Sequence, residues 1–154
     1  MKTHRLFRIF LIALLALGLT ACQKKEEERV GRYGMLDKGT PEYTAVMFMR
    51  SIYMDDTLDV AVEMSSNKMA RILLNYHTNR NVQRHLFNLK FDTVDITPQE
   101  SSRVARSEFA EESTITLFLS GSYNGDKVED IRSLDLIKQG GEWRVDKIHP
   151  DHFL

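Results

Sequence analysis

Alternating apolar and polar residues between tight-turn signals dominate the carboxyl-terminal part of the chain, and they constrain its fold more than any other feature. In residues 113–123, every second side chain from Ile115 to Leu119 is aliphatic. Asn124-Gly125 follows as a favoured two-residue hairpin turn of type I′, and Gly140-Gly141 marks the next turn. Alternation with a period of two is typical of strands that bury one face. The sequence therefore predicts an antiparallel meander.

This meander is expected to contain five strands and to carry helices on one of its faces. The expected strands are residues 91–96, 103–109, 113–123, 127–138 and 142–148. The first strand is expected to end at Thr97-Pro98. Because the alternation leaves only one face apolar, the helices that precede the strands must cover that face and leave the other face polar.

Three helices are expected between residues 40 and 88. Thr40 is a suitable N-cap with Pro41 at the first helical position, and this helix is expected to run to about Met54. Asp55-Asp56-Thr57 offers a cap for a short helix over residues 58–64. Ser65-Ser66-Asn67 caps a third helix, in which we expect a break near Asn79.

The first of these helices is apolar on two sides. One stripe at helical spacing contains Ala45, Phe48, Met49 and Ile52, and the other contains Tyr43, Val46, Met47, Arg50 and Met54. A helix of this kind is either central to the core or turned toward something outside it.

The amino terminus has the three parts of an export signal. Lys2, Arg5 and Arg8 give positive charge, residues 9–19 are nearly all apolar, and small residues follow. The apolar stretch is about eleven residues, whereas a spanning helix needs roughly twenty. We therefore expect residues 1–21 to be a removable signal peptide.

Leu19-Thr20-Ala21-Cys22 resembles the lipobox of bacterial lipoproteins, in which the Cys is acylated and becomes the first residue after cleavage. Cys22 is also the only cysteine, and an odd free thiol is unusual in an exported protein. The resemblance implies a lipid anchor. Gln23, which is not Asp, then favours the periplasmic leaflet of the outer membrane, with an inner or single membrane as the alternative.

The segment after the anchor reads as a tether. Residues 22–39 contain the lipidated Cys and a charged, glycine-containing spacer, so the domain is expected to cover residues 40–154. Removal of the signal takes away three basic residues and no acidic one, which lowers the net charge from −1 to about −4. Such a chain is a poor polyanion binder, and we expect no nucleic-acid partner.

Helices followed by a curled antiparallel sheet that closes on Gly141-Glu142-Trp143-Arg144-Val145 resemble the nuclear transport factor two-like (cystatin-like) family. The resemblance covers residues 40–148 and implies an α+β cone, lined by helices, that often dimerises through its sheet. Members include isomerases, dehydratases, secretion-system subunits and scaffolds, so the fold alone does not choose a function.

Enzymes of that family typically place an Asp, His or Tyr inside the cone as acid or base, and we can assign no such pair. His77 is expected on the surface because it follows Tyr76, which belongs to the apolar stripe. Four residues are candidate lining for a small apolar ligand: Met47, Tyr53, Met54 and Tyr76. We therefore predict no catalytic residues and no cofactor.

Metal binding is not expected either. The methionines of residues 47–69 fall mostly at core spacing and serve as deformable filler. His149 and His152 stand in a short polar tail, where no Cys and no carboxylate other than Asp151 supports a metal site. The predicted function is an interaction or structural module of the cell envelope that docks a partner or a second copy. A carrier of a small apolar ligand is the alternative, and an isomerase or hydrolase is the third hypothesis.

Overall fold

The computed structural model describes residues 36–99 and 110–149 of the 154-residue chain. The expected signal, Cys22 and most of the expected tether lie outside the described residues, as do His152 and the expected strand of residues 103–109.

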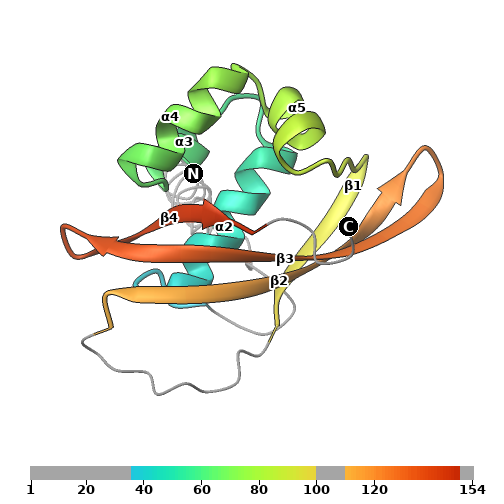
Figure 1. Cartoon of the computed structure of the whole chain (residues 1–154). Helices are drawn as coiled ribbons and strands as arrows, with labels where there is room; N and C mark the ends of the chain where they lie inside the picture. The colour runs from blue at the N-terminus through green and yellow to red at the C-terminus, as the bar shows by residue number, and fades with distance from the viewer. Residues whose placement is uncertain (1–35, 100–109, 150–154) are drawn as a thin grey trace, which may run out of the picture.

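The described residues form an α+β domain in which helices precede an antiparallel sheet (Figure 1). The helices are α2 (Pro41–Met54), α3 (Asp59–Glu63), α4 (Asn67–Tyr76), α5 (Asn79–Asn81) and the π-helix η2 (Val82–Leu86). The strands are β1 (Thr93–Pro98), β2 (Glu112–Tyr123), β3 (Asp126–Gln139) and β4 (Glu142–Ile148).

Two of the three predicted helix caps are confirmed. The Thr40 hydroxyl accepts a hydrogen bond from the Tyr43 N–H at 3.3 Å, and the Ser66 hydroxyl accepts one from the Met69 N–H at 3.2 Å. The cap expected before α3 is wrong, because the hydroxyl of Thr57 donates to the Asp59 carboxylate at 2.9 Å and caps no backbone group.

The break expected near Asn79 is present and lies between α4 and α5. His77 ends α4 with a left-handed φ of 65°, and Thr78 caps α5. Asn79 is buried, and its amide donates to the carbonyl oxygens of Ser51, Asp55 and Thr57 at 2.6–3.1 Å. This single side chain therefore satisfies carbonyl groups at and beyond the end of α2.

The predicted meander is confirmed for the described strands, which pair antiparallel in the order β1-β2-β3-β4. Asn124 and Gly125 both have positive φ, at 54° and 88°, as a type I′ turn requires. β1 begins at Thr93, two residues later than expected, and it includes Thr97 and Pro98, which were expected to follow the strand. Pro98 is tolerated because β1 stands at the edge of the described sheet, where a strand can lack a donor.

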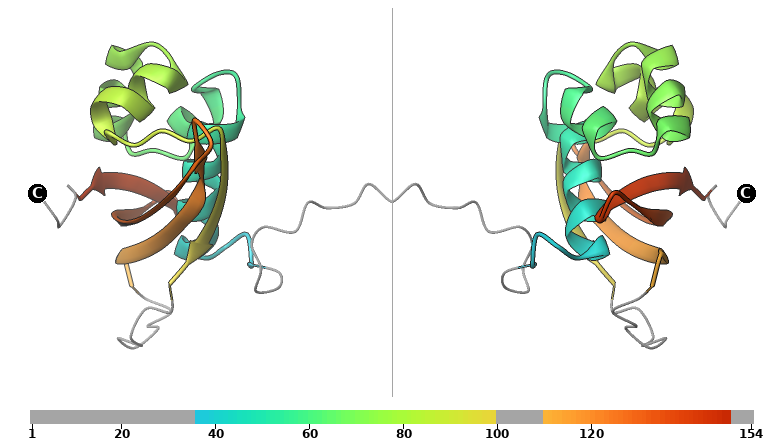
Figure 2. Two further views of the ribbon diagram at one scale, coloured as in Figure 1. Left: turned by 90° about the vertical axis from the view of Figure 1, so that its right-hand side faces the viewer. Right: turned by 90° about the vertical axis from the view of Figure 1, so that its left-hand side faces the viewer.

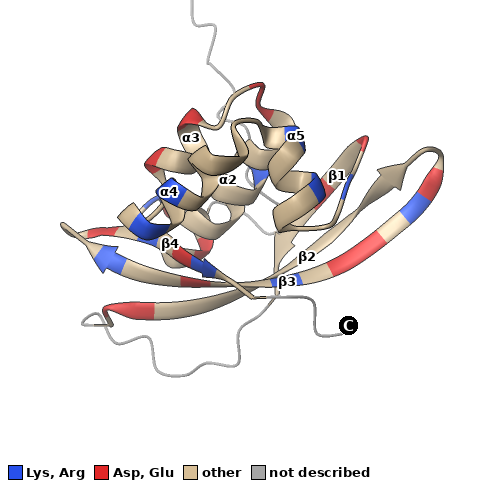
Figure 3. Ribbon diagram, turned by 45° about the horizontal axis from the view of Figure 1, so that its top comes forward, with Lys and Arg blue, Asp and Glu red and all other residues tan. Residues whose placement is uncertain are grey.

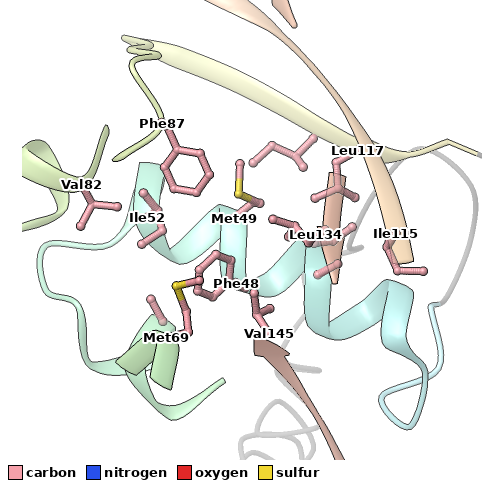
Figure 4. Close-up of a cluster of buried hydrophobic side chains, with 14 of the residues drawn as sticks. Phe48, Met49, Ile52, Met69, Val82, Phe87, Ile115, Leu117, Leu134 and Val145 are labelled. Carbon is pink, nitrogen blue, oxygen red and sulfur yellow. The ribbon is translucent and has the colours of Figure 1, made fainter. Parts of the chain in front are cut away.

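The core lies between α2 and the concave face of the sheet. In Figure 4, Met49 of α2 lies on the side of the strand residues Leu117 and Leu134, whereas Phe48 and Ile52 lie toward side chains of the segments that follow α2. All five side chains are fully buried. The stripe of α2 that contains Phe48 is therefore wholly in the core, and Val46 of the second stripe is buried with it, whereas Met54 of that stripe is exposed. Side chains of α2 thus fill the concave space.

Backbone hydrogen bonds join the helix layer to the sheet at β4. The Ser66 N–H donates to the Val145 carbonyl at 2.8 Å, and the Val145 N–H donates to the Met64 carbonyl at 2.9 Å. Figure 2 shows the result: the sheet curls around α2, and α4 and α5 sit at one end of the concave side. The convex face, called the outer face below, is covered by no helix of the described residues.

Candidate functional site

The outer face carries an apolar pair among polar residues. Phe118 of β2 stands directly opposite Ile131 of β3 in the sheet register. Ile131 is 41% exposed and Phe118 is half-buried. The next pair along the strands, Thr116 and Ser133, shares a hydroxyl hydrogen bond of 2.9 Å. A cross-strand apolar pair on the open side of a sheet is a contact surface of the kind that protein interfaces bury.

A hydrogen-bonded set on the same two strands continues this face. The Thr114 hydroxyl donates to Asp135 Oδ1 at 2.7 Å, and His149 Nε2 lies 2.7 Å from Asp135 Oδ2. Burial alone would raise the pKa of the Asp135 carboxyl. The hydrogen bonds from Thr114 and His149, with the nearby ammonium group of Lys147, outweigh burial and lower that pKa below its usual value.

This set does not have the arrangement of a catalytic triad. In a triad the imidazole stands between the carboxylate and the nucleophilic hydroxyl. Here the carboxylate of Asp135 stands between the hydroxyl of Thr114 and the imidazole of His149, so the imidazole cannot take the hydroxyl proton. The contacts instead fix the end of β4 to β3, together with a 2.9 Å bond from the His149 N–H to the Ser133 carbonyl.

A charged pair lies inside the domain, and the sequence interpretation missed it. Arg132 is only 4% exposed, and its guanidinium donates to Asp130 Oδ1 at 2.5 Å and to the Phe87 carbonyl at 3.3 Å. The missed signal was strand parity, because residues 130 and 132 share a face with the buried Leu134 and Leu136. A charge at such a position must be paired inside the fold.

Tyr53 lies close to this pair and is held in place by aromatic neighbours. Its hydroxyl donates to the Leu89 carbonyl at 3.1 Å, and its ring meets Phe91 edge to face at 5.5 Å between centroids. Burial raises the pKa of the Tyr53 hydroxyl, Arg132 lowers it and Asp130 raises it. The hydrogen bond to the Leu89 carbonyl satisfies the polar end of this largely buried side chain, so its contacts are those of a structural residue.

A depression of about 390 Å³ opens beside Tyr53, between the end of α2 and the start of β1. Its lining residues are Tyr53, Met54, Phe91, Asp92, Thr93 and Val94. Two of the four residues predicted as ligand lining thus lie together here. The other two lie elsewhere: Met47 is half-buried earlier on α2, and Tyr76 stacks on His85 at 6.5 Å.

The other described histidine and methionine residues considered as candidates lie either on the surface or in the core. His77 is exposed, as predicted. Met49 and Met69 are buried in the core, whereas Met54 is 47% exposed. Within residues 36–99 and 110–149, no three His, Cys, Asp or Glu side chains are grouped closely enough to hold a metal ion. None of the helices described there is long and apolar enough to cross a membrane.

No protein-family model matches the chain, and no curated protein matches it either.

Proposed function

We propose that this chain is a lipid-anchored envelope lipoprotein whose α+β domain docks another protein through the outer face of its sheet. The anchor is the acylated Cys22, and the location is the periplasmic leaflet of the outer membrane. The support for the anchor is the order of basic residues, a short apolar stretch and Leu19-Thr20-Ala21-Cys22 in the sequence. The outer face of an inner or single membrane is the alternative location.

The domain is further proposed to be a relative of the nuclear transport factor two-like cone. The support is a curled antiparallel meander whose last strand, β4, carries Trp143, together with a long helix across the concave face. Two features differ from an open cone. The described sheet is not closed, and α2 side chains fill the concave space. A filled interior favours docking over ligand binding or catalysis, and we propose no enzymatic activity.

The observation that carries the docking function is the exposed pair of Phe118 and Ile131 on a face that no described helix covers. Polar hydroxyls surround this pair, which matches the apolar centre and polar rim of protein interfaces. The docked protein is a second copy or another envelope protein. The family resemblance supports a second copy, because members often dimerise through the sheet.

Substitutions of Ile131 test the docking surface. Ile131→Ser, in the chain from residue 22 onward with Cys22→Ser, should weaken the dimer, or the complex with a cross-linked envelope partner, by at least about fivefold in its dissociation constant. The physical reason is that truncation of a central interface residue commonly costs more than 1 kcal/mol. Light scattering after size exclusion measures the dimer, and cross-linking in envelope extracts measures the partner.

Ile131→Val is the matched control, since it keeps an aliphatic side chain at the same position in the sheet. It should retain the complex that Ile131→Ser loses. Equal complex formation by both variants would show that the outer face is not the docking surface.

Replacement of Cys22 tests the anchor. Cys22→Ser should move the protein from the membrane fraction to the soluble fraction, because the acyl chains supply about 0.8 kcal/mol per buried methylene. Intact mass of the wild-type protein should show a start at Cys22 with added acyl groups. A chain that still carries residues 1–21, or that starts at Cys22 without acyl groups, would contradict the anchor.

The carrier function remains a second candidate because Tyr53 and Met54 border the same 390 Å³ depression. A small apolar ligand would lie on Phe91 and Val94 there. Native mass spectrometry of the purified chain tests this candidate directly. A copurifying small molecule that is lost in Met54→Lys would support a carrier, and a bare chain would count against it.

A further inference from the structure

One part of the chain is basic although the whole is slightly acidic. Between Glu63 and Asp92 there are five Lys and Arg residues and no Asp or Glu, whereas the full chain has a net charge of −1. This segment contains α4, α5 and η2. The average charge therefore hides a strong local asymmetry.

The basic side chains of this segment gather on the helix layer. Figure 3 shows Lys and Arg along α4 and α5 and on toward β1, and Asp and Glu mostly at other places on the domain. Arg71, Arg80 and Arg84 are all exposed. Lys68 lies 3.5 Å from Asp146, with its side chain 64% exposed. No ion pair within the described part of the chain engages Arg71, Arg80 or Arg84.

An exposed aliphatic side chain lies on α4, one helical turn after Arg71. Leu74 is 54% exposed, the largest exposed fraction among the large apolar side chains described. It points outward because the opposite side of α4 is occupied by Met69 and Leu73, which are buried. Arg71 precedes Leu74 by three residues and lies on the same exposed side of the helix. We name Arg71, Leu74, Arg80 and Arg84 the basic helical face.

We propose that the basic helical face lies against the anionic phospholipid headgroups of the membrane that holds the protein. Arginines without acidic partners attract anionic lipid, and an exposed leucine on the same helix layer can enter the boundary of the acyl region. A bilayer surface supplies both the anionic groups and the apolar region, and the proposed acyl anchor already holds the domain beside it, so a bilayer is the occupant that we propose.

This inference rests on the proposed acyl anchor. The segment between the anchor and the domain is long enough to allow the contact. The 14 residue-to-residue steps from Cys22 to Leu36 can span at most about 46 to 50 Å. The domain begins at the end of α2 away from Met54, and α2 is about 21 Å long. The chain is thus long enough for either end of the domain to meet the lipid. A basic surface also adds the second signal that strengthens acyl anchoring.

Contact through the helix layer would leave the outer face of the sheet turned away from the lipid. Phe118 and Ile131 lie on that face, on the other side of the sheet from α2. The two surfaces therefore have different partners: the helix layer contacts the membrane, and the outer face of the sheet contacts another protein.

Vesicle sedimentation with an unacylated protein tests the inference. The protein is the chain from residue 22 onward with Cys22→Ser, so that no acyl chain contributes. The vesicles are phosphatidylcholine alone, or three parts phosphatidylcholine to one part phosphatidylglycerol. We expect binding to the mixed vesicles only, and we expect added salt to weaken it because salt screens exposed charges.

Charge variants locate the contact. Arg71→Gln, Arg80→Gln and Arg84→Gln combined should lower partition to the mixed vesicles on the order of 100-fold, since each basic residue at an anionic surface is worth about fivefold. Leu74→Ser should lower it roughly tenfold. The matched control is Lys127→Gln, Lys138→Gln and Lys147→Gln combined. It removes the same charge from exposed positions on the sheet and should change partition by less than about threefold.

Three results would overturn the inference: no binding to the mixed vesicles, equal binding to both vesicle types, or equal losses in the two triple variants. Binding to soluble polyglutamate without binding to vesicles would assign the face to an acidic protein and also overturn it. Acylation is read separately from the intact mass of the wild-type protein. An unacylated wild type contradicts the anchor alone, and failed vesicle binding contradicts the lipid contact alone.

Discussion

Removal of the buried guanidinium should be among the most damaging single changes in this domain. In Arg132→Met, the methionine side chain takes the place of the apolar stem of the arginine, so most of the packing is kept. The carboxylate of Asp130, however, loses the donor that lies 2.5 Å away, and the Phe87 carbonyl loses a donor at 3.3 Å. Leaving a buried charge without its partner costs about 3 to 5 kcal/mol. The Asp130 side chain is still 16% exposed, so we expect a loss near the lower limit, about 3 kcal/mol.

A second substitution separates the lost pair from lost packing. Asp130→Asn removes the unpaired charge, while its side-chain oxygen can still accept the 2.6 Å hydrogen bond from the Ile131 N–H. The double variant Arg132→Met with Asp130→Asn should therefore be more stable than Arg132→Met alone, by about 1 to 2 kcal/mol. The matched control is Lys127→Met, which removes an exposed basic residue from the same strand and should leave the denaturation midpoint unchanged.

Urea denaturation followed by tryptophan fluorescence measures these differences. Trp143 is the only tryptophan and is half-buried on β4, so its emission reports the loss of the sheet. With unchanged slopes, the shifts in midpoint convert directly to differences in the free energy of unfolding. An Arg132→Met protein within about 0.5 kcal/mol of wild type, or a double variant no more stable than it, would refute a stabilising interior pair.

Two further changes test other parts of the sheet. Asp135→Asn should destabilise the protein by at most about 1 kcal/mol near neutral pH, because solvent screens the half-exposed pair. The pKa of Asp135 is lowered in the folded state, so its contribution is present above the usual value of 3.8 and is lost as pH falls below it. The melting temperatures of the wild type and of Asp135→Asn should therefore converge in acid. A difference in melting temperature that does not change with pH would contradict the contribution of the ionised carboxylate. In Gly121→Ala, a Cβ would stand 1.9 Å from the Thr93 carbonyl oxygen and 2.9 Å from the Phe91 ring, so β1 must shift, at a cost of about 1 to 3 kcal/mol. Urea denaturation checks this value, and wild-type stability would show that β1 moves freely.

The candidate functional surfaces were only partly predictable from the sequence. The periodicity of α2 placed Tyr53 and Met54 beside a cavity, and they do border a depression. Met47 and Tyr76 were predicted at the same place and lie apart from it. Spacing along a helix gives the direction of a side chain relative to its own axis, but it does not give the segment packed against it. The contact of Asp135 with His149 was not foreseen, because it depends on where β4 ends beside β3.

The sequence by itself determined the local elements: the turn at Asn124-Gly125, the caps at Thr40 and Ser66, and the alternation that makes a meander. These depend on neighbours within a few residues, where backbone sterics and short hydrogen bonds decide the outcome. Only the tertiary structure decided that Arg132 is enclosed with Asp130, and that Gly121 must lack a side chain where β1 crosses it. The physical reason is that burial and close approach are properties of segments distant in the chain, which become neighbours only after α2 and the sheet have packed.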